Sequence, residues 1–457
     1  MDPDELFQET PNRARVGYIA LRTVQYATLF LSALVVARAL GPAGRAQYAL
    51  PLALATVVLG VCHLTLEGAA GRLLARKEAS LHELVSLLSA TTLLVSAVAV
   101  VVTTAVGYAI ADAVLAGASH TTVLLAALVV PFMLAAQVAG ELLLRLGILR
   151  RLGVVAVVSA TLQLALAVVL AAASLLTPER AMLITLIGFA VAGVATAAIL
   201  ASVSGLPALR PRLPPKLTRR VLSAALAFHP GTIALQLGAR IDLLVVGAFA
   251  SAHDAGLYSL SLTLADSIFL ASYTLSQTAL RTQTAAEESE AARFTFDFTR
   301  QSLYLSLAAA AVASLLAYPF ITLVFGQDWR GSVLPFVILV IATIAITLEA
   351  PARTLLMRLA RPSALSLLAC VGLILNVGTT VVLVQALGIA GAALASMVAF
   401  WAYAFAILNL AAKVTGIPMK TIFGPPRRDD LLAQVPRLVW SLFKRPAPLR
   451  YPPDRAA

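Results

Sequence analysis

Two residues of opposite charge lie deep within apolar segments of the chain. Arg240 and Asp266 are each ten residues from the short turn at 250–256. At a rise of about 1.5 Å per residue, both sit about 15 Å inside consecutive antiparallel helices, so their side chains can pair. Asp242 lies about 200° round the helix from Arg240 and must face another surface. A guanidinium is a forked donor that suits a phosphate, and an ionisable group buried in a membrane indicates a functional site.

A further charge within an apolar segment, Arg22, has no acid on its own segment. It either lines a wet cavity or reaches the membrane surface by extending its side chain. In the functional interpretation, Arg22 and Arg240 hold a phosphate-containing substrate. In the structural one, Arg240 and Asp266 fix helix packing and Arg22 marks a helix end. Four polar residues could contact hydroxyl groups in the same cavity, or simply bond neighbouring helices: Gln25, Tyr26, Gln236 and Asn376.

Acidic residues near the ends of other apolar segments are candidates for a gate. Glu141 and Arg145 are spaced i,i+4, and Glu349 and Arg353 repeat that spacing in the second half of the chain. At this spacing the two side chains meet on one helix face. Glu67 precedes three small residues, which allow helices to approach closely. We expect the two pairs to be structural or part of a gate, and Glu67 to act in gating.

Further titratable residues leave alternatives open. His229 precedes Pro230, and a proline that removes a backbone hydrogen bond predicts a hinge. We expect His229 to be packed or solvated, with proton transfer as the alternative. Asp242 and Asp266 could instead bind Na⁺ or H⁺. The two cysteines lie within apolar segments, so neither a disulfide framework nor a cysteine zinc site is predicted. We expect no metal and no cofactor.

The composition excludes a water-soluble globular protein. Apolar residues make up 60% and charged residues 12% of the chain, and the mean hydropathy is +0.91. Soluble domains have about 45–50% apolar and about 25% charged residues. The polar, acidic residues 1–12 do not resemble a cleavable signal peptide. The sequence therefore predicts an all-α polytopic membrane protein.

Twelve segments are long and apolar enough to span a membrane, which takes about 20 residues each. The longest connection, 205–220, separates a six-helix lobe at 1–204 from a second at 221–413, so we expect two lobes around a central cavity. The tail, 414–457, contains an amphipathic pattern at 429–445 that predicts a helix on the membrane surface; a disordered tail is the alternative. The predicted spans are 16–40, 46–71, 83–110, 121–145, 152–176, 182–204, 221–249, 256–280, 299–325, 332–356, 363–385 and 389–413.

The basic residues predict the orientation. With both termini in the cytoplasm, most Lys and Arg fall at cytoplasmic ends of the spans, and four arginines fall in outside-facing turns: Arg38, Arg45, Arg180 and Arg330. Lys and Arg concentrate on the cytoplasmic side of membrane proteins. This explains the net charge of +12 without a nucleic-acid partner, and it favours contact with anionic membrane lipids.

The chain repeats itself weakly. Residues 33–55 align without a gap to residues 243–265, and Leu142-Leu143-Leu144-Arg145-Leu146 aligns to Leu355-Leu356-Met357-Arg358-Leu359. With an even number of spans per half, the halves would be parallel repeats related by an axis along the membrane normal. This arrangement is typical of transporters with a site between the lobes.

Three motifs resemble a known family. They are the hairpin VVARALGPAGRAQYALPLALA at 35–55, the turn LVFGQDWRGSVLPFVIL at 323–339, and LILNVGTTVVLVQALGIAGAALASMVAFW at 373–401. They resemble the bacterial polysaccharide flippases, Wzx-type members of the multidrug/oligosaccharidyl-lipid/polysaccharide exporter superfamily. The likeness covers nearly the whole chain. The related lipid II flippases usually carry two more helices.

The resemblance implies a function in the bacterial cytoplasmic membrane. Such proteins move an undecaprenyl-diphosphate-linked oligosaccharide from the inner to the outer leaflet by alternating access, use cavity arginines to face the diphosphate, and serve cell-surface polysaccharide assembly, with possible partners among the assembly proteins. A cation-coupled multidrug exporter and a lipid II flippase remain alternatives. An enzyme is not expected, because the sequence lacks a GxxxxGK[ST] nucleotide loop and its outside connections are short.

Overall fold

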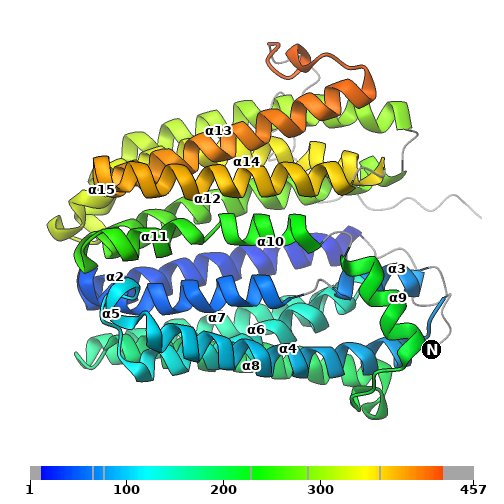
Figure 1. Ribbon diagram of the computed structural model, residues 1–457, viewed down its shortest axis with the longest axis horizontal. Coiled ribbons are helices and arrows are strands. Elements are labelled where there is room, and N and C mark those ends of the chain that lie inside the picture. The colour runs from blue at the N-terminus through cyan, green and yellow to red at the C-terminus, as the bar shows by residue number, and fades with distance from the viewer. Residues whose placement is uncertain are drawn as a thin grey trace, which may run out of the picture.

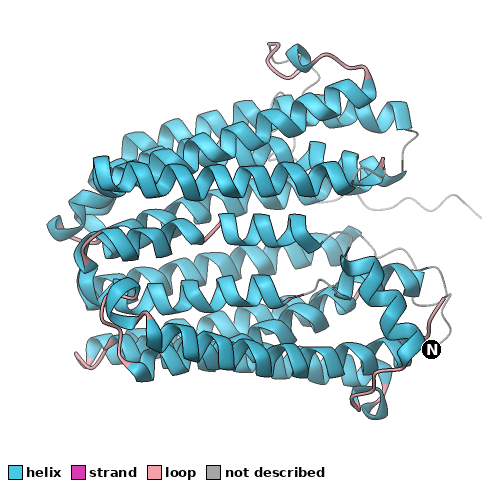
Figure 2. Cartoon of the chain, viewed as in Figure 1, coloured by secondary structure: helices cyan, strands magenta, loops and turns pink. Residues whose placement is uncertain are grey.

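The computed structural model describes residues 12–63, 66–75, 78–226, 229–285, 288–359 and 362–425. The described part of the chain consists of helices and short connections, and it contains no strand (Figure 2). The prediction of an all-α membrane protein is confirmed. The amphipathic tail helix predicted at 429–445 lies outside the described residues.

Eight described helices are long and apolar enough to cross a membrane, or nine if the bent pair α10–α11 counts as one span. Two of them, of 47 and 53 residues, are each long enough for two spans. Figure 1 labels the helices α2 (Asn12–Cys62), α3 (Leu66–Ala75), α4 (Leu81–Ala109), α5 (Ala111–Val114), α6 (His120–Arg145), α7 (Leu149–Ala172), α8 (Pro178–Ser204), α9 (Pro215–Leu226), α10 (His229–Gly238), α11 (Ile241–Phe249), α12 (Ala252–Ala285), α13 (Glu288–Val324), α14 (Val333–Arg358) and α15 (Pro362–Thr415).

Glycine turns divide the two longest helices. Gly41 within α2 has φ 65°, and Gly388 within α15 has φ 60°. Glycine adopts this left-handed conformation without the steric cost that a Cβ atom brings. Each helix therefore folds back as a hairpin with two arms. If each arm counts as one span, α10–α11 as one broken span and α12 as one span, the number of segments agrees with the predicted twelve. The number of spans stays a prediction.

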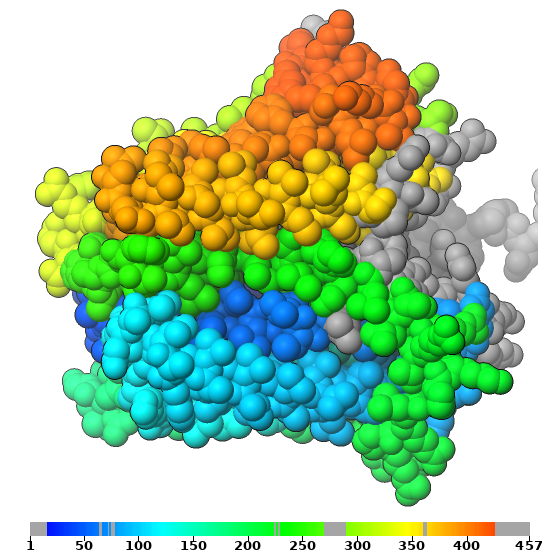
Figure 3. All heavy atoms as spheres, viewed as in Figure 1, coloured from blue at the N-terminus to red at the C-terminus, as the bar shows by residue number. Residues whose placement is uncertain are grey.

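The helices form two groups that follow the halves of the sequence. The arms of α2 pack with α4 and α6–α8, and α12–α15 pack with one another (Figure 1). Residues of the two halves occupy adjoining regions of the molecular surface (Figure 3). The hairpins of the predicted repeat, at Gly41 and between α11 and α12, lie at the same end of the bundle. We call this the outer end, following the predicted orientation, and the opposite end the inner end.

Two spans differ from the sequence prediction, the second and the seventh. The second span ends at Cys62, and Glu67 belongs to the separate short helix α3 rather than to the end of that span. In the predicted seventh span, residues 221–226 belong to α9 and His229–Gly238 form α10. That span is itself broken, since α10 and α11 meet at 45°. The predicted hinge at Pro230 stays a prediction, and the described break lies further along the span, between Gly238 and Ile241.

The connection between the halves is folded rather than extended. Leu206–Leu209 form a 3-10 turn, and α9 buries Val221 and Ala225. Backbone and side-chain bonds join this segment to Ser86 of α4: the Arg212 amide donates to the Ser86 carbonyl at 3.3 Å, and the Ser86 hydroxyl donates to the Arg210 carbonyl at 2.5 Å. An ion pair joins Arg220 to Glu78. The connection is thus anchored on the first half.

The halves touch closely at the outer end. A Cβ atom on Gly256 of α12 would collide with the carbonyl oxygen of Pro42, and one on Gly247 of α11 would collide with the carbonyl of Val114. Arg38 also donates to the Val324 carbonyl across the halves at 3.1 Å. We call these three contacts the outer seam. In two of these contacts, a glycine packs so closely against a backbone carbonyl that no room is left for a Cβ atom. Only glycine therefore fits at 247 and 256.

Candidate substrate cavity

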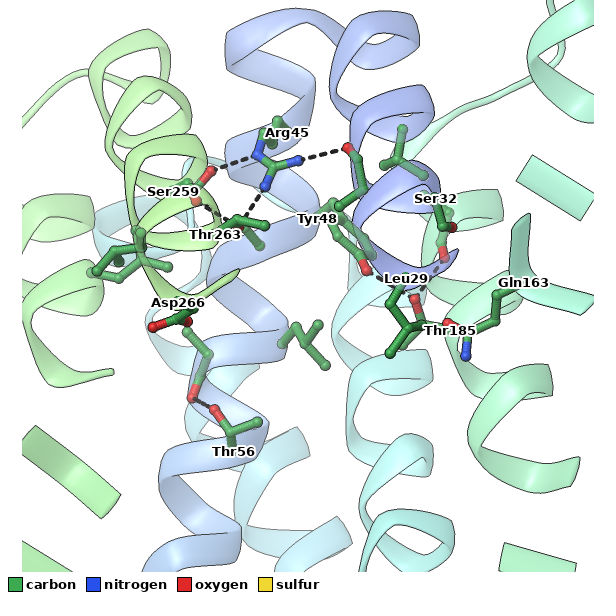
Figure 4. A pocket seen from close by; sticks show the side chains of 18 of the residues that line it. Leu29, Ser32, Arg45, Tyr48, Thr56, Gln163, Thr185, Ser259, Thr263 and Asp266 are labelled. Atoms are coloured by element: carbon green, nitrogen blue, oxygen red, sulfur yellow. Dashed lines mark hydrogen bonds between the residues drawn. The ribbon is translucent and has the colours of Figure 1, made fainter. Parts of the chain in front are cut away.

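A polar cavity of about 300 Å³ lies between the halves. Its walls come from α2, α6, α7 and α8 of the first half and from α11 and α12 of the second, and Arg240 lines it at the break before α11. Figure 4 shows Arg45, Gln163 and Asp266 around this cavity. The polar side chains that line it are Ser32, Arg45, Tyr48, Thr56, Gln163, Thr185, Arg240, Ser259, Thr263 and Asp266.

Arg45 is the most buried charge in this wall, with 3% of its surface exposed. Its guanidinium faces α12 and donates to the hydroxyls of Ser259 at 3.0 Å and Thr263 at 2.8 Å, and to the Ala33 carbonyl at 3.3 Å (Figure 4). All three partners are neutral. A buried cation without a carboxylate costs free energy, so Arg45 is suited to meet an anion that enters the cavity.

The sequence prediction counted Arg45 among the residues of an outside-facing turn, whereas the structure buries its side chain in the second arm of α2. Arg45 follows Gly41 by only four residues, so depth along the helix predicts an exposed position. The packing of α12 over this turn, through the Gly256 contact, covers the side chain. The only signal in the sequence is that the repeat pairs Arg45 with Ala255, so the charge belongs to one half alone.

Arg240 and Asp266 pair as predicted, at 2.8 Å, with 37% and 42% of their side chains exposed. Arg240 stands at the break between α10 and α11, and Asp266 projects from α12. Both line the cavity, where the pair is open enough for a competing anion to approach the guanidinium. The broken helix thus places a charged group within the span, an arrangement typical of transporter binding sites.

Asp242 faces away from the cavity, as the helix geometry predicted. It is 1% exposed and accepts hydrogen bonds from the Leu243 amide at 2.8 Å, the Tyr258 hydroxyl at 2.7 Å and the Ser396 hydroxyl at 3.0 Å. Three donors replace the water that a buried carboxylate loses. Because these donors belong to α11, α12 and α15, Asp242 joins three helices of the second half.

Asn376 lies outside the cavity and bonds a neighbouring helix, which is the second of the two roles that the sequence left open. It is 1% exposed, donates to the Gly238 carbonyl at 3.3 Å and accepts from the Thr380 hydroxyl at 3.0 Å. Gly238 is the last residue of α10, so its carbonyl has no partner further along that helix. Asn376 supplies the missing donor and stabilises the break beside Arg240.

Replacing Asn376 by leucine is expected to destabilise the protein by about 1–3 kcal/mol, because the buried Gly238 carbonyl would lose its donor. Thermal unfolding in detergent measures this. Gln385→Leu is the matched control, since that amide is exposed and bonds a carbonyl of its own helix. Equal melting temperatures for the two variants would show that Asn376 does not support the break.

The other residues that the sequence predicts in the substrate cavity do not line the polar cavity. Arg22 donates to the Tyr26 hydroxyl at 2.5 Å and its guanidinium lies 4.8 Å from the Tyr26 ring centre. Gln25 is partly buried and its side-chain oxygen has no partner within the described residues. Gln236 packs on Gly60 across the halves. None of Arg22, Gln25 and Gln236 lines either large cavity in the described structure.

A second, apolar cavity of about 770 Å³ lies on the other side of the first arm of α2. The same two helices, α2 and α12, contribute to both cavities, so the polar and apolar spaces are neighbours. Tyr26 is one of its few polar-tipped residues. The remaining lining residues are Thr23, Ala27, Phe30, Leu31, Leu264, Ser267, Ile268, Ala313, Leu316, Ala317, Phe320 and Phe336.

The predicted gate residues form pairs at the inner end. Glu141 accepts from Arg145 at 2.7 Å, and the buried Glu349 accepts from Arg353 at 2.9 Å. Both ion pairs are therefore confirmed, while their part in gating stays a prediction. Glu67 is buried and bonds His63 at 2.9 Å, a partner that the sequence prediction did not name.

The sequence matches a family described as polysaccharide biosynthesis protein over residues 16–280, which is more than half of the chain. The chain belongs to this family. No curated protein matches this family member in sequence.

Solved structures show the fold of this polysaccharide biosynthesis family member. It is similar to a lipid II flippase MurJ in an inward closed conformation, with a TM-score of 0.67, 14% identity, and 94% of this chain and 93% of that chain covered. It is also similar to an inward-facing multidrug resistance MATE transporter of the MOP superfamily, with a TM-score of 0.63, 14% identity, and 86% and 95% covered. The family member thus has membrane-spanning helices and the fold of these membrane transporters.

Proposed function

We propose that the protein flips an undecaprenyl-diphosphate-linked oligosaccharide from the inner to the outer leaflet of the bacterial cytoplasmic membrane. The observation that carries this proposal is the position of Arg45 and Arg240 in one polar cavity that adjoins an apolar one. An amphipathic lipid needs both environments at once. Guanidinium groups suit the diphosphate, hydroxyl and amide groups suit the sugar, and the apolar cavity suits the polyprenyl chain.

Membership of the polysaccharide biosynthesis family supports a glycan-bearing substrate. The likeness to MurJ keeps the lipid II substrate as an alternative, because lipid II shares the polyprenyl diphosphate. Vesicles that contain either lipid separate the two: the proposal requires faster movement of the oligosaccharide carrier than of lipid II.

The proposed direction requires both termini in the cytoplasm. On a background without Cys62 and Cys370, single cysteines at the exposed positions His253 and Gln327 are expected to react with an impermeant maleimide from outside cells. Cysteines at the exposed Lys216 and Ser363 should react only after the membrane is opened. Reversed labelling would contradict the orientation and the inner-to-outer direction.

A cation-coupled drug exporter is the second candidate. Asp266 in the cavity wall and the likeness to MATE transporters favour it. An exporter of cationic drugs would bind its substrate through Asp266, and replacement of Arg240 would then free that carboxylate and strengthen cation binding. The flippase proposal expects the opposite result, in which loss of Arg240 weakens binding of an anionic lipid.

Arg240→Lys is expected to reduce flipping strongly although the charge is kept, because an ammonium cannot reproduce the paired donors of a guanidinium. Flipping is measured as the appearance of labelled glycan at the outer surface of vesicles. If Arg240 only pairs with Asp266, lysine would largely suffice.

Arg240→Ala alone is ambiguous, because it leaves Asp266 without its partner. Removing one member of a buried pair costs about 3–5 kcal/mol, and the cost is smaller here because the pair is partly exposed. The double variant Arg240→Ala, Asp266→Ala removes both charges. A folded double variant that flips at the normal rate would refute the role of Arg240 in substrate binding.

A further inference from the structure

The charged side chains of the polar cavity gather on one side of it. Arg45 donates to the hydroxyls of Ser259 and Thr263 of α12, and Asp266 of α12 pairs with Arg240. The helices α7 and α8 contribute only uncharged side chains to the lining, and Figure 4 shows Gln163 and Thr185 of these helices across the cavity from Asp266. We call the lining residues of α7 and α8 the neutral wall: Gln163, Ala181, Ile184, Thr185 and Phe189.

Gln163 gives the neutral wall an unpaired amide. Its side chain is half-buried, lines the cavity and forms no hydrogen bond with another described residue. A side-chain amide has two N–H donors and an acceptor oxygen. Nearly all buried polar groups in proteins have a partner, so an amide that faces a cavity without one is available to whatever molecule enters.

Close packing of α7 on α8 fixes the position of this amide. The Gln163 side chain lies over Gly188 of α8, where an added Cβ atom would come within 2.2 Å of the Gln163 Nε2 atom. Gly188 and Thr185 are spaced i,i+3 and therefore share one face of α8. The amide is thus held beside the Thr185 hydroxyl before any ligand binds, which lowers the entropy cost of binding.

Two hydroxyl oxygens extend the neutral wall toward the buried cation. The Thr185 hydroxyl donates to the Ala181 carbonyl at 3.1 Å, so the Tyr48 hydroxyl is the donor in its 2.9 Å bond to Thr185. Both oxygens keep a lone pair that can accept. Tyr48 is spaced i,i+3 from Arg45 on the second arm of α2, a spacing that brings Cβ atoms to about 5–6 Å. The neutral wall therefore begins one side chain away from Arg45.

This arrangement fits a sugar joined directly to a diphosphate. In a side-chain amide the C=O and one N–H point the same way, so one of two adjacent sugar hydroxyls can donate to Oε1 while the other accepts from Nε2. A carboxylate on that sugar would lie against a wall without a cation, and it would lose its hydration without compensation. The wall therefore suits an uncharged sugar with adjacent free hydroxyl groups.

We propose that Gln163, Tyr48 and Thr185 form the subsite for the first sugar of the carrier lipid, and that this subsite selects an uncharged sugar with two adjacent hydroxyl groups. The proposal rests on the proposed function, because that function places the diphosphate at Arg45 and Arg240. The two arginines bind the diphosphate whatever sugar follows it, so affinity for the carrier and choice of the sugar come from opposite sides of the cavity.

Two carriers test the subsite on the full chain in detergent: polyprenyl diphosphate without a sugar, and polyprenyl diphosphate bearing one glucose. The ratio of their two Kd values measures the affinity that the sugar adds. Gln163→Leu is expected to lower this ratio about tenfold, because neutral hydrogen bonds to the sugar are lost, and to leave the Kd of the bare carrier unchanged. Gln385→Leu removes an exposed amide of α15 and is the matched control. An unchanged ratio in Gln163→Leu would overturn the subsite.

The neighbouring glycine gives an independent variant. Gly188→Ala should lower the same ratio without touching the sugar, because the methyl group displaces the Gln163 amide. In a Gln163→Ala background, the same change should have no further effect on the ratio, since the two changes act through one amide. An additional loss there would mean that Gly188 does not act through Gln163.

The selected class of sugar is tested with a third carrier, which bears glucuronic acid in place of glucose. The parent is expected to bind it more weakly than the glucose carrier, and equal or tighter binding would refute selection of an uncharged sugar. Failure of the parent to bind the bare carrier would be a different result, since it refutes the proposed role of Arg45 and Arg240 and the subsite with it.

Discussion

Replacing Gly256 by alanine is expected to open the outer seam. The added methyl group would overlap the Pro42 carbonyl oxygen, and neither backbone can yield without separating α12 from α2. Overpacking of this kind costs about 1–3 kcal/mol. Because the cost falls only on the state in which the outer ends touch, the population with an open outer end should rise about 5- to 150-fold.

Cysteine labelling measures this shift. Ala49 lines the polar cavity, and a cysteine there, on a background without Cys62 and Cys370, should react faster with an impermeant maleimide from outside. Gly378→Ala is the matched control, since a Cβ atom at that helical glycine meets no atom within 4 Å. Equal labelling rates in the two variants would mean that the close contact at Gly256 does not hold the outer end shut. Flipping should fall in Gly256→Ala alone.

Replacing Arg45 by methionine should abolish most substrate binding while leaving the fold intact. The residues that contact Arg45 keep their own bonds, because Ser259 also donates to the Gly256 carbonyl and Thr263 to the Ser259 carbonyl, both at 2.8 Å. Replacing a buried cation that has neutral partners by an apolar side chain removes the free-energy cost of burying an unpaired charge. A lost hydrogen bond to a charged phosphate, at about 1.5–3 kcal/mol, weakens lipid binding about 10- to 150-fold.

Two measurements separate binding from folding in this variant. Thermal unfolding in detergent should show a melting temperature equal to or above that of the parent, and vesicle flipping should fall with the affinity. Arg330→Met, which removes an exposed arginine at the outer end, should leave both unchanged. If Arg45→Met melts earlier and its folded fraction flips normally, Arg45 serves only to bind the Ala33 carbonyl beside the Gly41 turn.

Local geometry explains what the sequence predicted well. The pairing of Arg240 with Asp266 follows from their equal distances to one turn, and the burial of Asp242 elsewhere follows from its angle round the same helix. The i,i+4 pairs of Glu141 and Glu349 depend on a single helix each. Such quantities need only the helical rise and repeat.

Contacts between distant segments explain what the sequence did not predict. The burial of Arg45 depends on how α12 crosses the Gly41 turn, and the role of Asn376 depends on a break at Gly238 that no proline marks. The sequence singled out Pro230 instead, which lies in α10 before that break. Periodicity and depth describe one helix at a time, so they cannot report which helices meet.

The anchored connection between the halves has a consequence for biosynthesis. Val221 and Ala225 of α9 are buried, and Arg220 forms an ion pair with Glu78 of the first half. The chain emerges from the ribosome with its N-terminus first, and folding units form in that order. The first 226 residues therefore contain the described partners of α9 in the first half, so α9 can dock there before the second half is translated.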